Sequence, residues 1–185
     1  MLQQLHENNV SCTLCPRHKT CISPIIGQTT SKPIVFVGDW PTYVDNITEE
    51  NFQGRPGQLF DKILREVGLS RSQVYITNIV KCYSKTVPKK TEVDTCRRWL
   101  YKEFDIIKPQ VVFTLGKLPA SRLLHLKCKD KLADVVGKIV EVPYMSKFKL
   151  CPLFSLTTLM NRSDWELTKH IGYIKTAIDG ITQPN

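Results

Sequence analysis

Short apolar runs alternate along the chain with segments in which apolar residues recur at helical spacing. The runs are rich in β-branched residues and predict strands at residues 33–38, 74–80 and 110–116, with weaker candidates at 139–142 and 149–154. Helical spacing predicts helices at residues 57–67, 92–107 and 163–179, and a short helix after the third strand, through residue 124. Thr91 is the expected N-cap of the helix at 92–107. This alternation predicts an α/β fold: a three-layer sandwich in which helices flank a central, mostly parallel sheet.

The length of 185 residues suits one globular domain with a substantial core. No internal repeat or domain boundary is evident, so residues 1–185 are expected to form a single domain. No apolar run approaches the length that crosses a bilayer, and residues 1–10 lack the apolar stretch of a secretory signal. We therefore expect a cytoplasmic protein that makes no membrane contact.

The charge balance adds a first indication of function. The chain carries 26 Lys and Arg residues against 17 Asp and Glu residues, a formal net charge of +9. Such an excess favours a polyanionic partner, most simply nucleic acid. Taken by itself, a basic composition without functional meaning is an equally good interpretation.

Cysteine spacing indicates a metal site. The seven cysteines are an odd number, which argues against a secreted disulfide framework. Cys12 and Cys15 form a pair that can chelate one ion from a tight turn, and Cys82 and Cys96 are the natural completing ligands. Spacing alone leaves zinc and an iron–sulfur cluster open, with the wide split of the second pair favouring a cluster. The remaining cysteines are expected to be packing residues: Cys21, Cys128 and Cys151.

Polar side chains follow three of the predicted strands. Asp39 comes directly after the first strand, Asn78 lies in the second, and Ser155 follows the last. Ligands of open α/β sheets bind beyond the carboxyl ends of the strands, so these three side chains are expected to converge there. An amide, a carboxylate and a hydroxyl could together read the edge of a base. They could also be ordinary turn and cap residues, and the pattern alone favours this second interpretation.

Two longer motifs carry a family resemblance. Residues 74–82 read Val-Tyr-Ile-Thr-Asn-Ile-Val-Lys-Cys, and residues 52–59 read Phe-Gln-Gly-Arg-Pro-Gly-Gln-Leu. The first resembles the Val-Tyr-Ile-Thr-Asn-x-Val-Lys-Cys motif of the iron–sulfur uracil-DNA glycosylases, family 4, and the second is similar to their Phe-Val-Gly-x-Ala-Gly-x-Leu. Shorter matches lie at Pro88, Glu92, Cys96 and Leu115–Gly116. The resemblance is colinear from Cys12 to about Ile178.

The resemblance implies a uracil-DNA glycosylase-like sandwich and a set of metal ligands. A four-iron (4Fe-4S) cluster would be bound by Cys12, Cys15, Cys82 and Cys96, with zinc as the alternative. The cluster would tie the N-terminal segment, residues 1–32, to the edge of the sheet.

The resemblance also implies a pocket for a flipped base. Asn78 would hydrogen-bond the Watson–Crick edge of an extruded uracil, because an amide offers both a donor and an acceptor. Phe52 would stack on the base, although a core aromatic is the alternative. Trp40 would shape the pocket, and Asp45 lies where the family has a second acidic residue.

DNA contacts are expected around this pocket. Arg55, Lys81 and Lys85 would contact phosphates. Taken one at a time, Lys81 and Lys85 are better interpreted as solvated surface charges, and it is the collective positive bias that favours DNA. Leu159 and Met160 would wedge into the base stack. The family's second motif ends in an arginine that is missing from its usual place here, and Arg162 lies beside that position.

Two departures from the family pattern affect the expected chemistry. Asp39 stands where the family has glutamate, and Trp40 and Thr42 change the pocket shape and the backbone freedom around it. Asp39 keeps the carboxylate that orients water or stabilises the sugar cation. Ser155 stands where the family has the histidine that stabilises the departing base. Losing one such donor costs roughly 3 kcal/mol, on the order of a hundred- to a thousand-fold in rate.

The sequence therefore predicts a base-flipping DNA glycosylase that hydrolyses the N-glycosidic bond of uracil or a related modified pyrimidine, with Asp39 and Ser155 as catalytic residues. The alternative is a weak or inactive homologue that binds DNA or a replication or repair protein. The expected partner is single- or double-stranded DNA, and the protein is expected to be a monomer.

Overall fold

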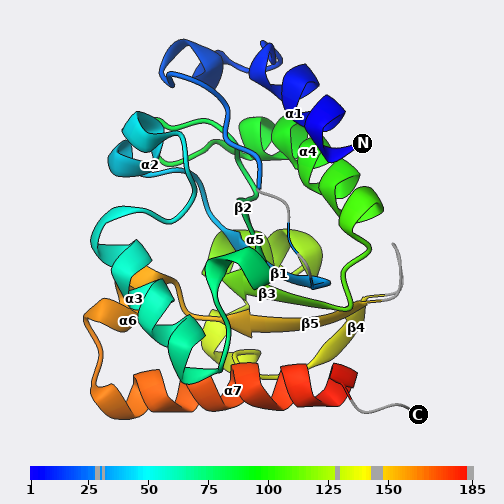
Figure 1. The fold of residues 1–185 in the computed structure, drawn as a ribbon. Helices are drawn as coiled ribbons and strands as arrows, with labels where there is room; N and C mark the ends of the chain where they lie inside the picture. The colour runs from blue at the N-terminus through cyan, green and yellow to red at the C-terminus, as the bar shows by residue number, and fades with distance from the viewer. Residues whose placement is uncertain (28–29, 31, 128–129, 143–147, 183–185) are drawn as a thin grey trace.

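A five-stranded sheet forms the centre of the molecule in the computed structural model, which describes residues 1–27, 30, 32–127, 130–142 and 148–182. The strand order is β2-β1-β3-β5-β4. Their bounds are β1 Ile34–Gly38, β2 Tyr75–Asn78, β3 Val111–Leu115, β4 Val140–Val142 and β5 Phe148–Leu153. The first four strands in this order are parallel, and β4 pairs antiparallel with β5. The prediction of a mostly parallel central sheet is confirmed (Figure 1).

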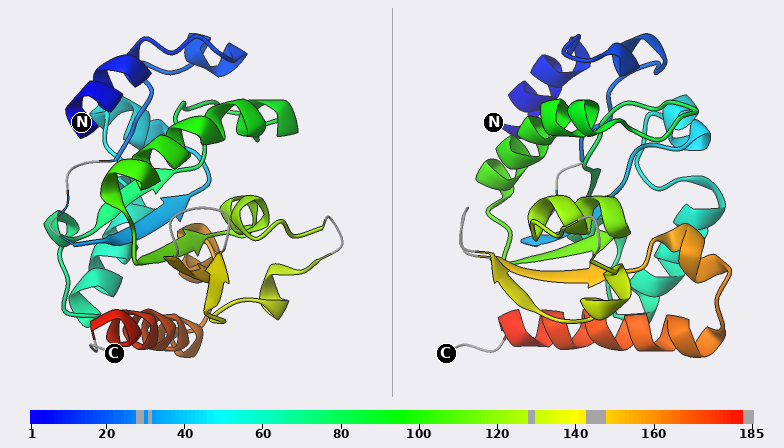
Figure 2. Two further views of the ribbon diagram at one scale, coloured as in Figure 1. Left: turned by 90° about the vertical axis from the view of Figure 1, so that its right-hand side faces the viewer. Right: turned by 180° about the vertical axis from the view of Figure 1, so that it is seen from behind.

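Helices cover both faces of this sheet (Figure 2). One layer contains α1 Leu2–Val10, α4 Lys90–Ile107 and α5 Lys117–Leu123. The other contains α3 Gly54–Glu66, α6 Leu156–Met160 and α7 Asp164–Thr182. Helix α2 spans Tyr43–Thr48, and three short 3₁₀ helices span Pro16–Lys19, Arg71–Gln73 and Leu132–Asp134. The predicted three-layer α/β sandwich is therefore confirmed.

Strand β1 shows why the apolar runs become central strands. All five of its residues are buried, because helices pack on both of its faces. Val35 and Val37 point to the α4 side, whereas Phe36 points to the α3 side. The Phe36 ring stacks on Phe113 at 4.8 Å and meets Phe60 edge-on at 5.0 Å. These contacts fix the position from which the chain leaves β1.

Several element boundaries differ from the predicted ones. Helix α3 begins at Gly54 rather than at residue 57. The expectation that Thr91 caps α4 is wrong: the helix begins at Lys90, and the Glu92 carboxylate accepts a hydrogen bond from Lys89 N at 2.8 Å. The N-cap is therefore Lys89, two residues before Thr91, and the Glu92 side chain satisfies its backbone N–H. None of the described helices is long and apolar enough to cross a membrane.

Candidate functional site

The carboxyl ends of the parallel strands surround a cavity of about 90 Å³. Residues from the β1–α2 turn, β2, the start of α3 and the start of α6 form its wall. All six side chains predicted to bind the base or act on it line this cavity: Asp39, Trp40, Asp45, Phe52, Asn78 and Ser155. The predicted convergence of Asp39, Asn78 and Ser155 at the carboxyl edge of the sheet is therefore observed.

Asp39 is a largely buried carboxyl group in the cavity wall. It follows β1 directly, and its Oδ1 atom is enclosed with no hydrogen-bond partner among the described residues. Gly116 packs so closely that a Cβ there would lie 3.0 Å from Oδ1. Burial raises the pKa of Asp39 from 3.8 to about 7. Near neutral pH this carboxyl group can therefore gain or lose a proton, or offset a nearby positive charge.

Asn78 ends β2 and is held at both its backbone and its side chain. Its Nδ2 donates to Asn51 Oδ1 at 2.8 Å, and its carbonyl oxygen accepts from Lys81 Nζ at 2.7 Å. It pairs in register with Gly38, where a Cβ would overlap Asn78 Oδ1. Only glycine at position 38 leaves room for this amide.

Phe52 has a left-handed backbone conformation with φ of 57°, which is uncommon for a bulky residue. Arg71 Nη2 donates to the Phe52 carbonyl oxygen at 2.6 Å and holds this conformation. The ring lines the cavity and also meets Phe60 edge-on at 5.2 Å. Its 7% exposure makes Phe52 a core aromatic that also presents a surface to the cavity.

Asp45 has both carboxylate oxygens engaged by backbone donors. Thr42 N donates to Oδ2 at 2.7 Å, and Gln53 N donates to Oδ1 at 2.6 Å. The first contact belongs to the capping box that starts α2, and the second ties this turn to the residue after Phe52. Asp45 therefore positions two parts of the cavity wall, and its predicted contact with a base stays a prediction.

Ser155 is the N-cap of α6. Its Oγ accepts from Thr158 N at 3.2 Å and lies 2.9 Å from Thr158 Oγ1. The histidine bonded to this segment is His170 of α7, whose Nε2 accepts from Phe154 N at 3.3 Å. Burial lowers the pKa of His170, and its ring stacks on Phe154. Within the described cavity wall, no histidine takes the place that Ser155 occupies.

Two of the predicted DNA contacts are wrong. Lys81 is fully buried, and its Nζ donates to Glu103 Oε2 at 2.6 Å, Thr77 Oγ1 at 2.6 Å and Asn78 O at 2.7 Å. All three ammonium donors are therefore used inside the protein, and none can reach a phosphate. Leu159 is 4% exposed and packs in the core on the α3 side of the sheet, so it cannot wedge into a base stack.

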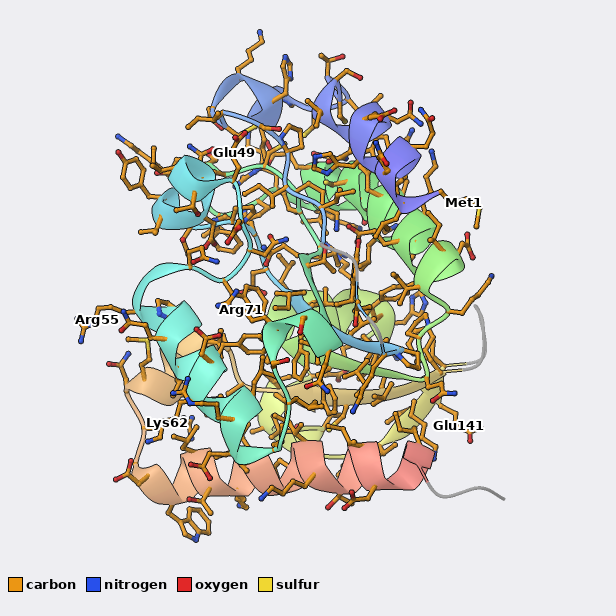
Figure 3. The ribbon with its side chains drawn as sticks, in the orientation of Figure 1. Met1, Glu49, Arg55, Lys62, Arg71 and Glu141 are labelled. Carbon is orange, nitrogen blue, oxygen red and sulfur yellow. The ribbon has the colours of Figure 1, made fainter. Side chains whose placement is uncertain are left out.

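The other predicted DNA contacts remain accessible. Arg55 projects outward from the start of α3 (Figure 3), and Lys85 is also exposed. Met160 is 37% exposed at the end of α6. Arg162 stacks on Phe154, with its guanidinium carbon 4.2 Å from the ring centroid, and pairs with Glu166 at 3.7 Å. Their contacts with DNA stay predictions.

A second hollow lies between the N-terminal segment and α4. Cys12, Cys15, Cys82 and Cys96 all line it, and all four are free thiols. Lys81 N donates to Cys96 Sγ at 3.3 Å, and burial raises the pKa of the Cys96 thiol to about 11. In the described part of the chain, however, no three His, Cys, Asp or Glu side chains are arranged closely enough to hold a metal ion.

The donor set of this second hollow nevertheless suits a soft metal group. Four thiols lie around one space, and a bound cation would reverse the burial effect that keeps Cys96 protonated. Of the cysteines expected to be packing residues, Cys151 is buried in the core and Cys21 is half-buried. Cys128 lies outside the described residues.

Sequence reasoning missed Asn51, which bonds to Asn78, and Glu103, which neutralises Lys81. Asn51 directly precedes Phe52, but a polar residue beside a motif has no distinctive pattern. Glu103 lies on the buried face of α4. A carboxylate among apolar positions of a helix is the sequence feature that could have indicated a buried ion pair.

Comparisons with known proteins agree with this arrangement. The chain belongs to the uracil DNA glycosylase superfamily, because the sequence model of that family matches residues 24–174. A type-4 uracil-DNA glycosylase of Pyrobaculum aerophilum is 34% identical over 142 residues, which cover 74% of this chain and 72% of that protein. One of Thermotoga maritima is 30% identical over 172 residues, which cover 91% and 88%.

A relative of another kind is a DNA polymerase of Bacillus phage SP01. It is 24% identical over 168 residues, which cover 88% of this chain and 18% of the polymerase.

Proposed function

We propose that this protein is a DNA glycosylase that hydrolyses the N-glycosidic bond of uracil, or of a related modified pyrimidine, after the base is flipped into the cavity. The observation that carries the proposal is the Asp39 carboxyl group, whose buried Oδ1 has no hydrogen-bond partner among the described residues, in the same cavity as the Asn78 amide and the Phe52 ring. The membership in the superfamily and the type-4 relatives support the same activity.

The cavity residues divide the reaction among them. Asn78 binds the base edge and Phe52 packs on its face, since flipping is required to reach the bond. As the bond between the sugar C1′ and the base nitrogen breaks, the base leaves with the electron pair and C1′ becomes cationic. The ionised Asp39 offsets this charge and accepts a proton from the water whose oxygen bonds to C1′.

Ser155 gives the departing base little help. Its hydroxyl is engaged in capping α6 and is a shorter donor than histidine. We therefore expect slow uracil excision relative to an enzyme with a histidine at this position.

Around the cavity, DNA binding rests on the exposed basic residues and on the net charge of +9. Arg55, Lys85 and Arg162 would contact phosphates, and Met160 would enter the base stack beside the flipped nucleotide. Lys81 and Leu159 take no part, because both are buried.

We further propose that Cys12, Cys15, Cys82 and Cys96 hold a four-iron cluster, with zinc as the alternative. Such a group would be structural, joining the N-terminal segment, residues 1–32, to α4 and to the loop after β2 within a single domain. Visible absorbance together with iron and sulfide analysis of protein purified without oxygen tests this. Colourless protein with one zinc per chain contradicts the cluster.

Excision assays test the proposed activity. Purified protein in molar excess is incubated with single- and double-stranded oligonucleotides that carry uracil or 5-substituted uracils, and abasic sites are then cleaved. Strand breaks with the wild type and none with Asn78→Ala are expected. The exposed-site variant Gln58→Ala serves as the matched control and should cut like the wild type.

A second candidate function is a DNA-binding homologue that serves replication rather than repair. The phage DNA polymerase relative and the serine at position 155 favour it. This function predicts DNA binding without an abasic product for any base at enzyme excess, and the excision assay separates the two candidates.

A further inference from the structure

Asn51 has a side chain whose orientation is fixed by the atoms around it. Its Nδ2 lies 3.1 Å from Ile26 O and 3.2 Å from Ile76 O. Carbonyl oxygens only accept hydrogen bonds, so the atom that faces both of them must be the nitrogen. Asn51 is 7% exposed, which excludes water as a substitute partner for most of its surface. Its oxygen therefore points the other way.

This fixed oxygen in turn fixes the Asn78 amide. Asn51 Oδ1 is 2.8 Å from the Asn78 side chain, so the Asn78 atom that faces it must be the donor, Nδ2. A flipped Asn78 would bring two oxygens together in a buried site and leave both without a donor. Asn78 Oδ1 is consequently held beside Gly38, in the cavity wall.

We infer that Asn51 is a positioning residue that decides which base edge Asn78 can read. With one N–H given to Asn51, Asn78 presents its oxygen and its other N–H. This pair complements an edge in which a ring N–H adjoins a carbonyl, as in uracil and 5-substituted uracils. Cytosine presents the opposite pattern, a ring acceptor beside an amino group, and is mismatched at both atoms. The inference rests on the proposed base-binding role of Asn78.

Binding rather than cleavage provides the sharpest test. Single-stranded oligonucleotides that carry one 2′-fluoro-2′-deoxyuridine or one 2′-fluoro-2′-deoxycytidine resist cleavage, and single strands remove the contribution of base pairing. Fluorescence anisotropy gives the ratio of the two dissociation constants. The wild type should prefer the uracil probe, and Asn51→Leu should reduce that preference at least tenfold, because the amide of Asn78 can then turn.

Two further variants keep the test decisive. Asn51→Ser places a hydroxyl at this position, which can donate or accept a hydrogen bond and so cannot fix the Asn78 amide. This variant should also lose the preference for the uracil probe. It replaces Asn51→Leu in the test if that variant does not fold. Gln58→Leu, on the exposed face of α3, should keep the wild-type ratio.

Equal affinity of the wild type for both probes overturns the inference, as does an unchanged ratio in a folded Asn51 variant. A wild type that prefers the uracil probe but excises nothing retains the inference and contradicts the proposed catalysis, so the two failures are distinguishable.

Discussion

Replacing Asp39 with asparagine should stabilise the folded protein at neutral and alkaline pH. The two side chains have nearly the same shape, but only aspartate must carry a charge at this largely buried position. Burial raises the pKa of Asp39 from 3.8 to about 7, and its Oδ1 has no hydrogen-bond partner among the described residues. The neutral amide of the Asp39→Asn variant avoids the cost of placing that charge in the fold.

The pH dependence follows from the direction of the pKa shift. As pH rises from about 4 to 7, the unfolded chain loses the proton while the folded protein keeps it, so the wild type loses stability across this window. Across the full interval the loss in unfolding free energy is about 4 kcal/mol, an upper limit because part of the Asp39 side chain still meets solvent. Of this, roughly 2–3 kcal/mol falls between pH 5 and pH 8.

Urea denaturation of both proteins at pH 5, 6, 7 and 8 measures the effect. The difference in unfolding free energy between Asp39→Asn and the wild type should move in favour of the variant by roughly 2–3 kcal/mol from pH 5 to pH 8. Groups that titrate in both proteins cancel in this difference. Asp105→Asn makes the same chemical change at an exposed position on α4 and is the matched control. A difference that is independent of pH, or that grows toward pH 5, contradicts the reasoning.

The remaining predictions concern the base pocket, the buried ion pair and α6. Ser155→His should raise single-turnover uracil excision on the order of 10²-fold, despite losing an N-cap that contributes about 1 kcal/mol; unchanged excision contradicts the assignment of this position. Lys81→Met should cost roughly 3–5 kcal/mol in urea denaturation because it leaves Glu103 charged and buried. Adding Glu103→Leu should recover most of that loss, and no recovery contradicts the pairing. Leu159→Ala should cost about 2–5 kcal/mol in the same assay, whereas Met160→Ala should leave stability nearly unchanged and weaken DNA binding.

The fold was predictable because its strands are buried on both faces. Continuous apolar runs such as 33–38 and 110–116 have one compatible environment in an α/β domain, the centre of a parallel sheet. The convergence of Asp39 and Asn78 followed from the same topology, since parallel strands end at one edge.

Side-chain roles that depend on distant partners were not predictable. Lys81 follows a strand in a basic protein, and only the position of Glu103 on α4 turns it inward. Leu159 belongs to a five-residue helix, whose buried face cannot be read from so few positions. Asn51 bonds to Asn78, and Asp45 bonds to Gln53, only because the tertiary fold brings these segments together. No sequence motif relates the members of either pair.

On the proposed mechanism, the cavity around Asp39 and Asn78 removes a base from DNA. Its most direct test is the quantity of free uracil released from a single-stranded uracil oligonucleotide by excess protein at pH 8, measured by mass spectrometry alongside abasic sites. We expect uracil and abasic sites in equal amounts with the wild type, and neither with Asn78→Ala or Asp39→Asn. Tight binding of the oligonucleotide by folded wild-type protein without any release of uracil would contradict it.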